Sequence, residues 1–140
     1  RWLVLENEDA GHPLQLLTGH EVCVDGAYLG GADGSVPGLA TLDPFSYVEP
    51  DKAFQAGDWA KVKELQDHLA RLMFLTRVVK ATVGFGAGVG AFKTALWQMG
   101  VFNTNQMREP VQALEGEDVA AIVEVLKKSG LMDADAPIRK

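Results

Sequence analysis

The sequence of 140 residues has little of several features that mark specialised classes of protein. It contains a single cysteine, Cys23, so no disulfide can form within the chain, and a reducing, cytoplasmic location is expected. Its apolar runs extend over only a few residues, so no membrane-spanning helix and no membrane partner are predicted. No segment has the basic, apolar and small-residue regions of a secretory signal peptide.

Positive charge and metal-binding patterns are also sparse. Thirteen Lys and Arg residues stand against nineteen Asp and Glu residues, and the net charge of −6 is dispersed, which argues against nucleic acid as a partner. His12, His20 and Cys23 lack the spacing of a metal site, and His12 and His68 are predicted to be surface residues. We therefore expect neither a metal nor an organic cofactor.

The most informative stretch is residues 14–38, where a strand, a helix and a second strand are predicted in order. The apolar run 14–18 is typical of a short buried strand that ends at Gly19. Residues 21–29 have apolar residues near helical spacing, and Gly30-Gly31 should end that helix. A strand, a crossover helix and a parallel strand form the repeating unit of α/β folds.

The second strand is predicted at Ser35-Val36, where Pro37 and Gly38 end it at once. The ends of the two strands should therefore lie beside each other. Functional groups gather where such strands end, yet this stretch contains no nucleophile, metal cluster or phosphate loop. We interpret it as the wall of a site whose reacting group comes from elsewhere.

Helices are predicted on both sides of this stretch. Residues 2–7 should close a helix with Trp2 and Leu5 on one face. Asp43-Pro44 should start another, which breaks or kinks at Pro50 and ends near Ala56.

The best helical pattern runs from residue 59 to residue 82, which would span about 36 Å. Asp58 is its expected cap, and its apolar stripe contains Trp59, Val62, Leu65, Leu69, Leu72, Met73 and Val79. Residues 84–90 carry four alternating glycines and are predicted to form a close-packed loop or a subunit contact, because they lack the phosphate-binding GxGxxG fingerprint.

Two further helices are expected near the C-terminus, with an irregular connection at residues 103–110 between them. The helix over 91–99 should present Phe92, Ala95, Leu96 and Met99, and the helix over 117–129 should bury Val119, Ile122, Val123 and Leu126. Residues 131–140 should be loose. Two strands cannot form a sheet covered on both faces, and the chain starts in an apolar stretch without Met, so we expect a fragment.

Four motifs in order carry a family resemblance. They are Leu16-Leu-Thr-Gly19, Gly30-Gly-Ala-Asp-Gly34 followed by Ser-Val, Gly57-Asp58 before a long helix, and Phe92-Lys-Thr-Ala-Leu96. With these motifs the chain resembles the C-terminal part of the dihydrodipicolinate synthase and N-acetylneuraminate lyase family. Those proteins are (β/α)8 barrels that hold pyruvate as a Schiff base on a lysine.

The resemblance implies a fold class of α/β, with the C-terminal part of a TIM barrel and a C-terminal helical extension. Residues 14–18 would be barrel strand seven and residues 34–37 strand eight. Residues 1–57 would form the last β/α units, residues 58–130 the helical extension and residues 131–140 a flexible tail. The Schiff-base lysine and the proton-shuttling tyrosine would lie outside this chain, and Lys80 and Lys93 are expected to be structural or solvated.

The resemblance also implies a substrate site. Gly19 would make room for the bound keto acid, and the backbone carbonyl of Val36 would face the pyruvyl group. His20 and Glu21 follow the strand-seven glycine, where the lyases bind the hydroxyls of a sugar; alternatively they are a helix-start pair.

The second substrate is left open by the departures from the lyase pattern. Val22 stands where a second acid is expected, and Gly38 stands where a serine is expected. These changes weaken a sialic acid interpretation, and recognition of a dicarboxylic aldehyde depends on an arginine outside this segment.

The leading hypothesis is therefore a segment of a class I aldolase or lyase that acts on pyruvate or another 2-keto acid. The complete protein would be a homo-oligomer, a dimer or a homotetramer, and this segment alone would be inactive. The alternative is a non-catalytic helical or half-barrel interaction domain that associates through its exposed strands and its long apolar helix.

Overall fold

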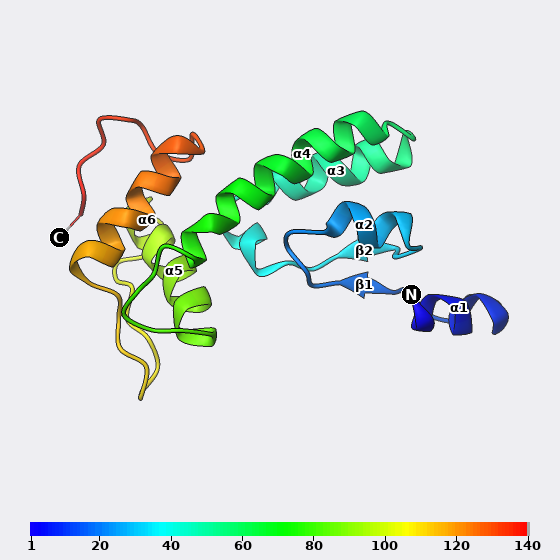
Figure 1. Ribbon diagram of the computed structural model, residues 1–140, viewed down its shortest axis with the longest axis horizontal. Helices are drawn as coiled ribbons and strands as arrows, with labels where there is room; N and C mark the ends of the chain where they lie inside the picture. The colour runs from blue at the N-terminus through cyan, green and yellow to red at the C-terminus, as the bar shows by residue number, and fades with distance from the viewer. Residues whose placement is uncertain (140) are drawn as a thin grey trace. The chain divides into compact units, whose positions relative to one another are not determined.

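Two short parallel strands stand at the centre of the first part of the chain (Figure 1). In the computed structural model, which describes residues 1–139, β1 (Leu17–Thr18) pairs with β2 (Gly34–Ser35), with Leu17 opposite Gly34. The Val36 N–H donates to the Thr18 carbonyl at 2.8 Å, which continues the pairing past the last strand residue. The predicted order of strand, helix and parallel strand is confirmed.

The strand residues are more exposed than the sequence predicts. Leu14 and Leu17 are 57% and 58% exposed, so the expected burial of residues 14–18 is wrong for this chain. The reason is that β1 has a single partner strand, and the described residues place no second layer over these side chains.

Helix α2 (Val24–Leu29) connects the strands and begins three residues later than predicted. It ends as the glycines indicate: Gly31 has φ +94°, and its N–H donates to the Tyr28 carbonyl at 3.0 Å. A side chain at Gly31 would also collide with Val4, because a Cβ there would lie 2.7 Å from Val4 Cγ1.

Helix α1 (Trp2–Asp9) confirms the predicted helix but not its face. Trp2 and Leu5 are exposed, whereas Val4 and Asn7 are buried. Asn7 ties the helix to the segment before β1, since its side chain accepts from the Leu14 N–H at 3.0 Å and donates to the Leu14 carbonyl at 2.9 Å.

A short 3-10 turn, η1 (Gly38–Thr41), leads to helix α3 (Phe45–Gln55). The Asp43 carboxylate accepts from the Ser46 N–H at 3.1 Å, as expected of a cap. Of the predicted break or kink at Pro50, the break is wrong, because the helix continues through this residue. Tyr47, Pro50 and Ala53 form one buried face at a spacing of three, and this burial holds the helix together despite the missing proline donor.

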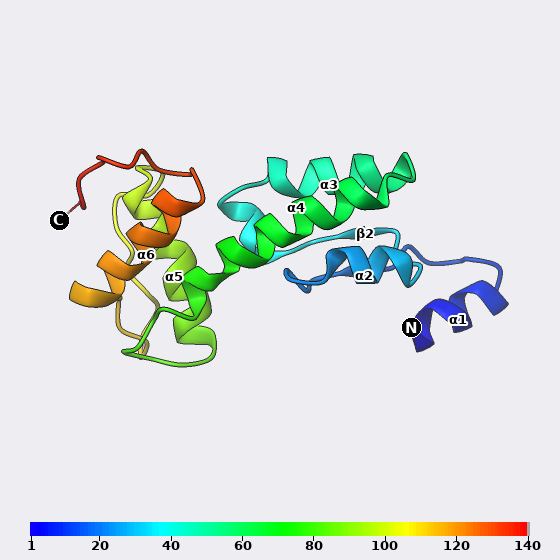
Figure 2. The same ribbon diagram turned by 45° about the horizontal axis from the view of Figure 1, so that its top comes forward.

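Helix α4 (Trp59–Leu72) lies beside α3 in Figures 1 and 2. Its start is as predicted, with Asp58 Oδ1 accepting from the Lys61 N–H at 3.0 Å. Phe54 of α3 stacks on Tyr28 of α2 at 4.7 Å between ring centroids and meets the edge of Trp59 at 5.5 Å. The three helices α2, α3 and α4 therefore share one aromatic contact.

The long helix is shorter than predicted, because η2 (Met73–Thr76) follows Leu72 and the backbone then becomes irregular. The Lys80 and Ala81 N–H groups donate to the buried Asp118 carboxylate at 2.9 and 3.0 Å. A continued helix would bind these groups to carbonyls four residues earlier. Val79 consequently leaves the predicted stripe.

The chain divides into two compact units, one of residues 1–70 and one that begins at Arg71. In the second unit α5 (Phe85–Gln98) lies beside α6 (Gly116–Lys128), and η2 packs on both. The residues of this unit that show no exposure are Leu72, Leu75, Ala91, Thr94, Ala95, Ile122 and Leu126. The predicted core face of α6 is confirmed.

The prediction of a glycine-rich loop at residues 84–90 is wrong, because most of that segment is the first half of α5. A Cβ at Gly90 would lie 3.3 Å from the Leu114 side chain, and a Cβ at Gly86 would lie 2.7 Å from Thr82 Oγ1. The glycines thus allow neighbouring segments to approach the helix closely, which compensates for their low helix propensity.

Residues 99–115 form an irregular connection, longer at both ends than the predicted 103–110, and Asn105 fastens it by donating to the Leu114 carbonyl at 2.8 Å. Residues 131–139 are also irregular, and the Arg139 N–H donates to Gln98 Oε1 at 2.9 Å. The predicted boundaries after residues 57 and 130 stay predictions.

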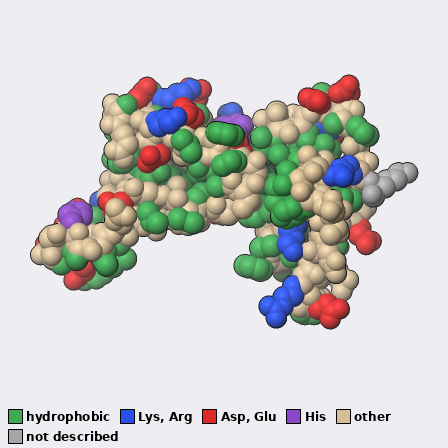
Figure 3. Space-filling model, turned by 180° about the vertical axis from the view of Figure 1, so that it is seen from behind, with side chains coloured by type: hydrophobic (Ala, Val, Ile, Leu, Met, Phe, Trp, Pro, Cys, Tyr) green, Lys and Arg blue, Asp and Glu red, His purple; other side chains and the backbone are tan. Residues whose placement is uncertain are grey.

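Figure 3 shows hydrophobic side chains on the surface of both units. None of the helices within residues 1–139 has the length and apolarity needed to cross a membrane.

Candidate functional site

The ends of β1 and β2 bring Gly19 and Val36 together. Because the strands are parallel and in register, Gly19 follows Thr18 at the same edge where Val36 follows Ser35. A Cβ on Gly19 would lie 3.8 Å from the Val36 carbonyl oxygen. The glycine therefore leaves open the space beside a carbonyl group that can accept a hydrogen bond.

Glu21 and Gly38 form a second link across the same edge. Glu21 Oε1 accepts from the Gly38 N–H at 3.1 Å, while the side chain is half-buried. This bond joins the segment after β1 to the segment after β2. It places a carboxylate beside the pair formed by Gly19 and Val36.

His20 lies between Gly19 and Glu21 in the sequence, in the segment that leads to α2. Its backbone N–H donates to Thr18 Oγ1 at 3.2 Å, and its imidazole is exposed. Chemically, this edge offers an exposed imidazole, a carboxylate and a backbone carbonyl. Such groups can bind and orient a polar molecule, but none of them is a nucleophile of the kind that forms an imine.

Two buried residues hold this edge, and the sequence interpretation missed both. Gln66 of α4 donates from Nε2 to the Glu21 carbonyl at 3.1 Å, and Tyr47 of α3 donates its hydroxyl to the same carbonyl at 3.4 Å. One signal pointed to Gln66: it lies four residues after Val62 and three before Leu69, so it is a polar residue on the apolar stripe.

The phenols near this edge stay neutral. Burial raises the pKa of Tyr47 far above its ordinary value of 10.0, and the nearby Glu21 and Asp43 carboxylates raise it further. Burial also raises the pKa of Tyr28, although the hydrogen bond with Ser35 opposes the shift. Tyr47 therefore remains a hydrogen-bond donor throughout the neutral range.

An open hollow of about 520 Å³ lies alongside β2. It is lined by Leu17, Tyr28, Asp33, Gly34, Ser35, Val36, Pro37, Ala40, Pro44, Tyr47, Val48 and Asp51. Val36 belongs to this lining, whereas Gly19, His20 and Glu21 do not. The predicted substrate contacts thus lie at the strand ends rather than inside the hollow.

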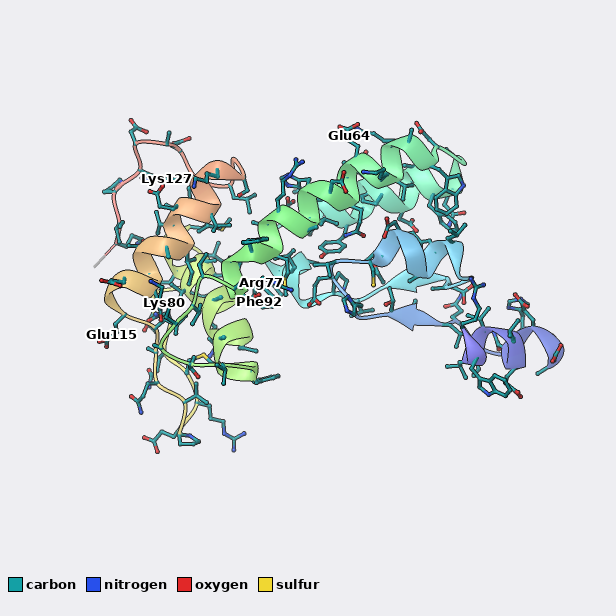
Figure 4. The ribbon with its side chains drawn as sticks, viewed as in Figure 1. Glu64, Arg77, Lys80, Phe92, Glu115 and Lys127 are labelled. Carbon is teal, nitrogen blue, oxygen red and sulfur yellow. The ribbon has the colours of Figure 1, made fainter. Side chains whose placement is uncertain are left out.

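The lysines of the second unit have structural surroundings. Lys93 Nζ donates to the Gln106 carbonyl at 2.9 Å, and Lys80, labelled in Figure 4, lies exposed between η2 and α5. Within residues 1–139 no group of three or more His, Cys, Asp or Glu side chains is arranged to hold a metal ion. The roles predicted for Gly19, His20, Glu21, Val36 and Gly38 stay predictions.

A comparison with protein families decides the relationship. The sequence model of the Dihydrodipicolinate synthetase family matches residues 5–129, most of the chain. The chain belongs to this family. The match includes both strands, the edge that they form and all helices from α2 to α6. Comparison with curated protein sequences gives no match.

Membership of the dihydrodipicolinate synthetase family supports a lyase or aldolase type of activity and suggests a TIM-barrel fold. The parallel pairing of β1 and β2 across α2 agrees with that fold, because barrel strands are parallel and separated by helices. Within residues 1–139 the sheet has two strands, fewer than the eight of a complete TIM barrel.

Proposed function

We propose that this chain is the C-terminal segment of a class I aldolase or lyase that acts on pyruvate or a pyruvate-derived 2-keto acid. In such an enzyme β1 and β2 are barrel strands seven and eight, and the helices after Asp58 form a C-terminal extension. The observation that carries the proposal is the pairing of Gly19 with the Val36 carbonyl at one strand edge in a member of the dihydrodipicolinate synthetase family.

The chemistry of this class requires a lysine amine with a lowered pKa, which forms an imine with the keto acid and withdraws electrons from it. The lysine lies outside the 140 residues in this proposal. Lys93 is bound to a backbone carbonyl, and the first-unit lysines Lys52, Lys61 and Lys63 each pair with a carboxylate on their own helix. The present segment supplies binding groups and leaves the covalent step to the remaining barrel.

In this proposal the residues at the strand ends bind two different substrates. Gly19 leaves room for the pyruvyl group, and the Val36 carbonyl faces it. His20 and Glu21 contact the second substrate, and the Gly38 N–H fixes the Glu21 carboxylate. The contacts favour neither an aldehyde nor a sugar acid as that second substrate.

Borohydride trapping with pyruvate tests the proposal. The isolated 140-residue chain should give no covalent adduct by mass spectrometry. The same chain joined to, or mixed with, the preceding six β/α units should gain one reduced pyruvyl group per chain. Lys93→Met in the complete protein is the control and should leave trapping unchanged. An adduct on the isolated chain would contradict the assignment of the lysine to the missing strands.

A second candidate is a non-catalytic interaction domain, which the exposed apolar side chains favour. Trp2, Phe45, Val83 and Phe85 are each more than three-quarters exposed. In the enzyme proposal such surfaces contact other barrel units or other subunits of a homo-oligomer. The exposed free thiol of Cys23 is compatible with a cytoplasmic protein. Failure of the assembled protein to trap pyruvate would favour the interaction domain.

A further inference from the structure

We propose that Gln66 is a positioning residue for the substrate-binding edge: from α4 it sets where Glu21 and the start of α2 lie, and thereby tunes recognition of the second substrate. This inference rests on the proposed function and deepens it. It assigns a role in recognition to a helix that lies outside the two strands.

Gln66 first binds the start of α2. The first N–H groups of a helix lack partners within that helix. Cys23, which precedes α2, makes no capping bond with its side chain. Gln66 Oε1 instead accepts from the Val24 N–H at 2.8 Å and from the Asp25 N–H at 3.2 Å. The amide of Gln66 therefore caps α2 from a different helix.

Gln66 also binds the backbone carbonyl of Glu21. Gln66 Nε2 donates to it at 3.1 Å, and the Tyr47 hydroxyl donates to it at 3.4 Å. The other end of Glu21 is held as well, because its carboxylate accepts from the Gly38 N–H. Glu21 is thus fixed at its backbone by α3 and α4 and at its carboxylate by the segment after β2.

The burial of Gln66 makes these hydrogen bonds costly to lose. Gln66 is 5% exposed, so water cannot readily replace a lost partner. Leaving buried donors unsatisfied is costly, and the Val24 and Asp25 N–H groups would lose their acceptor together, while the Glu21 carbonyl would keep only the Tyr47 hydroxyl. The simplest relaxation is a shift of the turn at residues 20–23. That shift would move His20 and Glu21 relative to Gly19 and Val36.

Two substitutions separate the two halves of the bonding. Gln66→Met keeps the length of the side chain and removes all three bonds. Gln66→Glu keeps an acceptor for the Val24 and Asp25 N–H groups but removes the donor to Glu21. The matched control is Gln98→Met, because Gln98 is also buried and also binds a distant backbone segment through Arg139.

The first measurement follows the Gly38 amide proton by NMR in the 140-residue chain. Its hydrogen bond to the Glu21 carboxylate should move its resonance downfield. Gln66→Met should return this resonance upfield and speed amide exchange at Val24 and Asp25 about tenfold, as expected for the loss of a buried hydrogen bond. Gln66→Glu should show the same upfield change at Gly38 but keep Val24 and Asp25 protected. Gln98→Met should behave as the parent chain at all three amides.

A Gly38 amide proton resonance that stays at its parent position in both Gln66 variants would overturn the proposal. If Gln66→Met unfolds the first unit, the Gln66→Glu variant decides by the same measurement. Unchanged exchange in α5 and α6 identifies an effect confined to the first unit.

The second measurement uses the complete enzyme. Gln66→Met should raise KM for the second substrate about tenfold with little change in kcat, because a binding group is displaced while the imine chemistry is untouched. A general folding defect would instead lower the active fraction, and so kcat, at constant KM. An unchanged KM in an enzyme that traps pyruvate normally would overturn the role of Gln66. Absence of trapping in the unsubstituted enzyme would overturn the proposed function itself.

Discussion

The two units of this chain are held together by different kinds of contact. The second unit buries a continuous apolar core between η2, α5 and α6, with Leu75, Ile122 and Leu126 fully enclosed. The first unit buries its helix contacts but leaves Leu17 on β1 and Val36 just after β2 mostly exposed. Its strand segment is fastened instead by polar side chains, with Asn7 bound to Leu14 and Glu21 bound to Gly38.

Both units leave apolar side chains exposed, Val83 and Phe85 in the second among them, so the difference lies in how the strand pair and the helical core are held. A two-residue parallel strand pair contributes little stability alone, so the helices carry the first unit. Polar bonds from neighbouring elements then define where its loops lie. A site built on such loops has its geometry set by distant helices, whereas the second unit is ordered by apolar contact.

The largest effect should come from deleting a core leucine in the second unit. Leu126→Ala should lower the free energy of unfolding by about 2–5 kcal/mol, because Leu126 has no exposed surface. Leu17→Ala in the first unit should cost less than about 0.5 kcal/mol, because Leu17 is 58% exposed. Amide exchange in α6 and near β1 measures each unit separately. Equal costs at the two leucines would remove the contrast between the units.

A smaller effect should distinguish two glycines of α5. Gly90→Val should cost about 1–3 kcal/mol, because a Cβ at this position already lies 3.3 Å from Leu114. Gly88→Ala should stabilise by about 0.5–1 kcal/mol, because no atom lies within 4 Å of a Cβ there. Urea unfolding followed by Trp97 fluorescence measures both changes. Stabilisation by valine at position 90 would show that Leu114 is not packed against the helix.

The smallest effect should be a pH dependence that belongs to the first unit. Burial raises the pKa of Tyr47 in the folded chain above its ordinary value of 10.0, so the unfolded chain loses this proton first. Stability is therefore unaffected by Tyr47 below about pH 10 and falls as the pH rises above it, by at most about 1.4 kcal/mol per pH unit. Tyr47→Phe should flatten this decline between pH 10 and pH 11 in urea unfolding of the first unit. Exchange at α6 serves as the internal control, and an identical decline in the variant would rule out Tyr47 as its source.

Local sequence signals predicted the features that depend on local chemistry. Gly31 ends α2 because its backbone angle suits glycine, and Asp58 caps α4 through a bond to a residue three positions away. The meeting of Gly19 and Val36 followed from the parallel strand order alone.

The errors have long-range causes. The Asp118 carboxylate ends the long helix early by binding the N–H groups of Lys80 and Ala81. Leu114 explains why a glycine-rich segment can be helical, and the buried face of α3 explains why Pro50 does not break it. None of these partners can be identified from residues nearby in the sequence. The same holds for Gln66, whose position on an apolar stripe shows that it needs a partner but not which one.

Because Gln66 binds the start of α2, the residue needed to cap this helix is not the one that precedes it but one on another helix. The residue that caps a helix start from its own chain segment is normally Ser, Thr, Asp or Asn. Here Cys23 makes no capping bond, so that position is free to vary, while the restriction falls on a residue more than forty positions later in the chain. Evolutionary drift in α4 can therefore alter the edge that carries Glu21 without any change in the strands themselves.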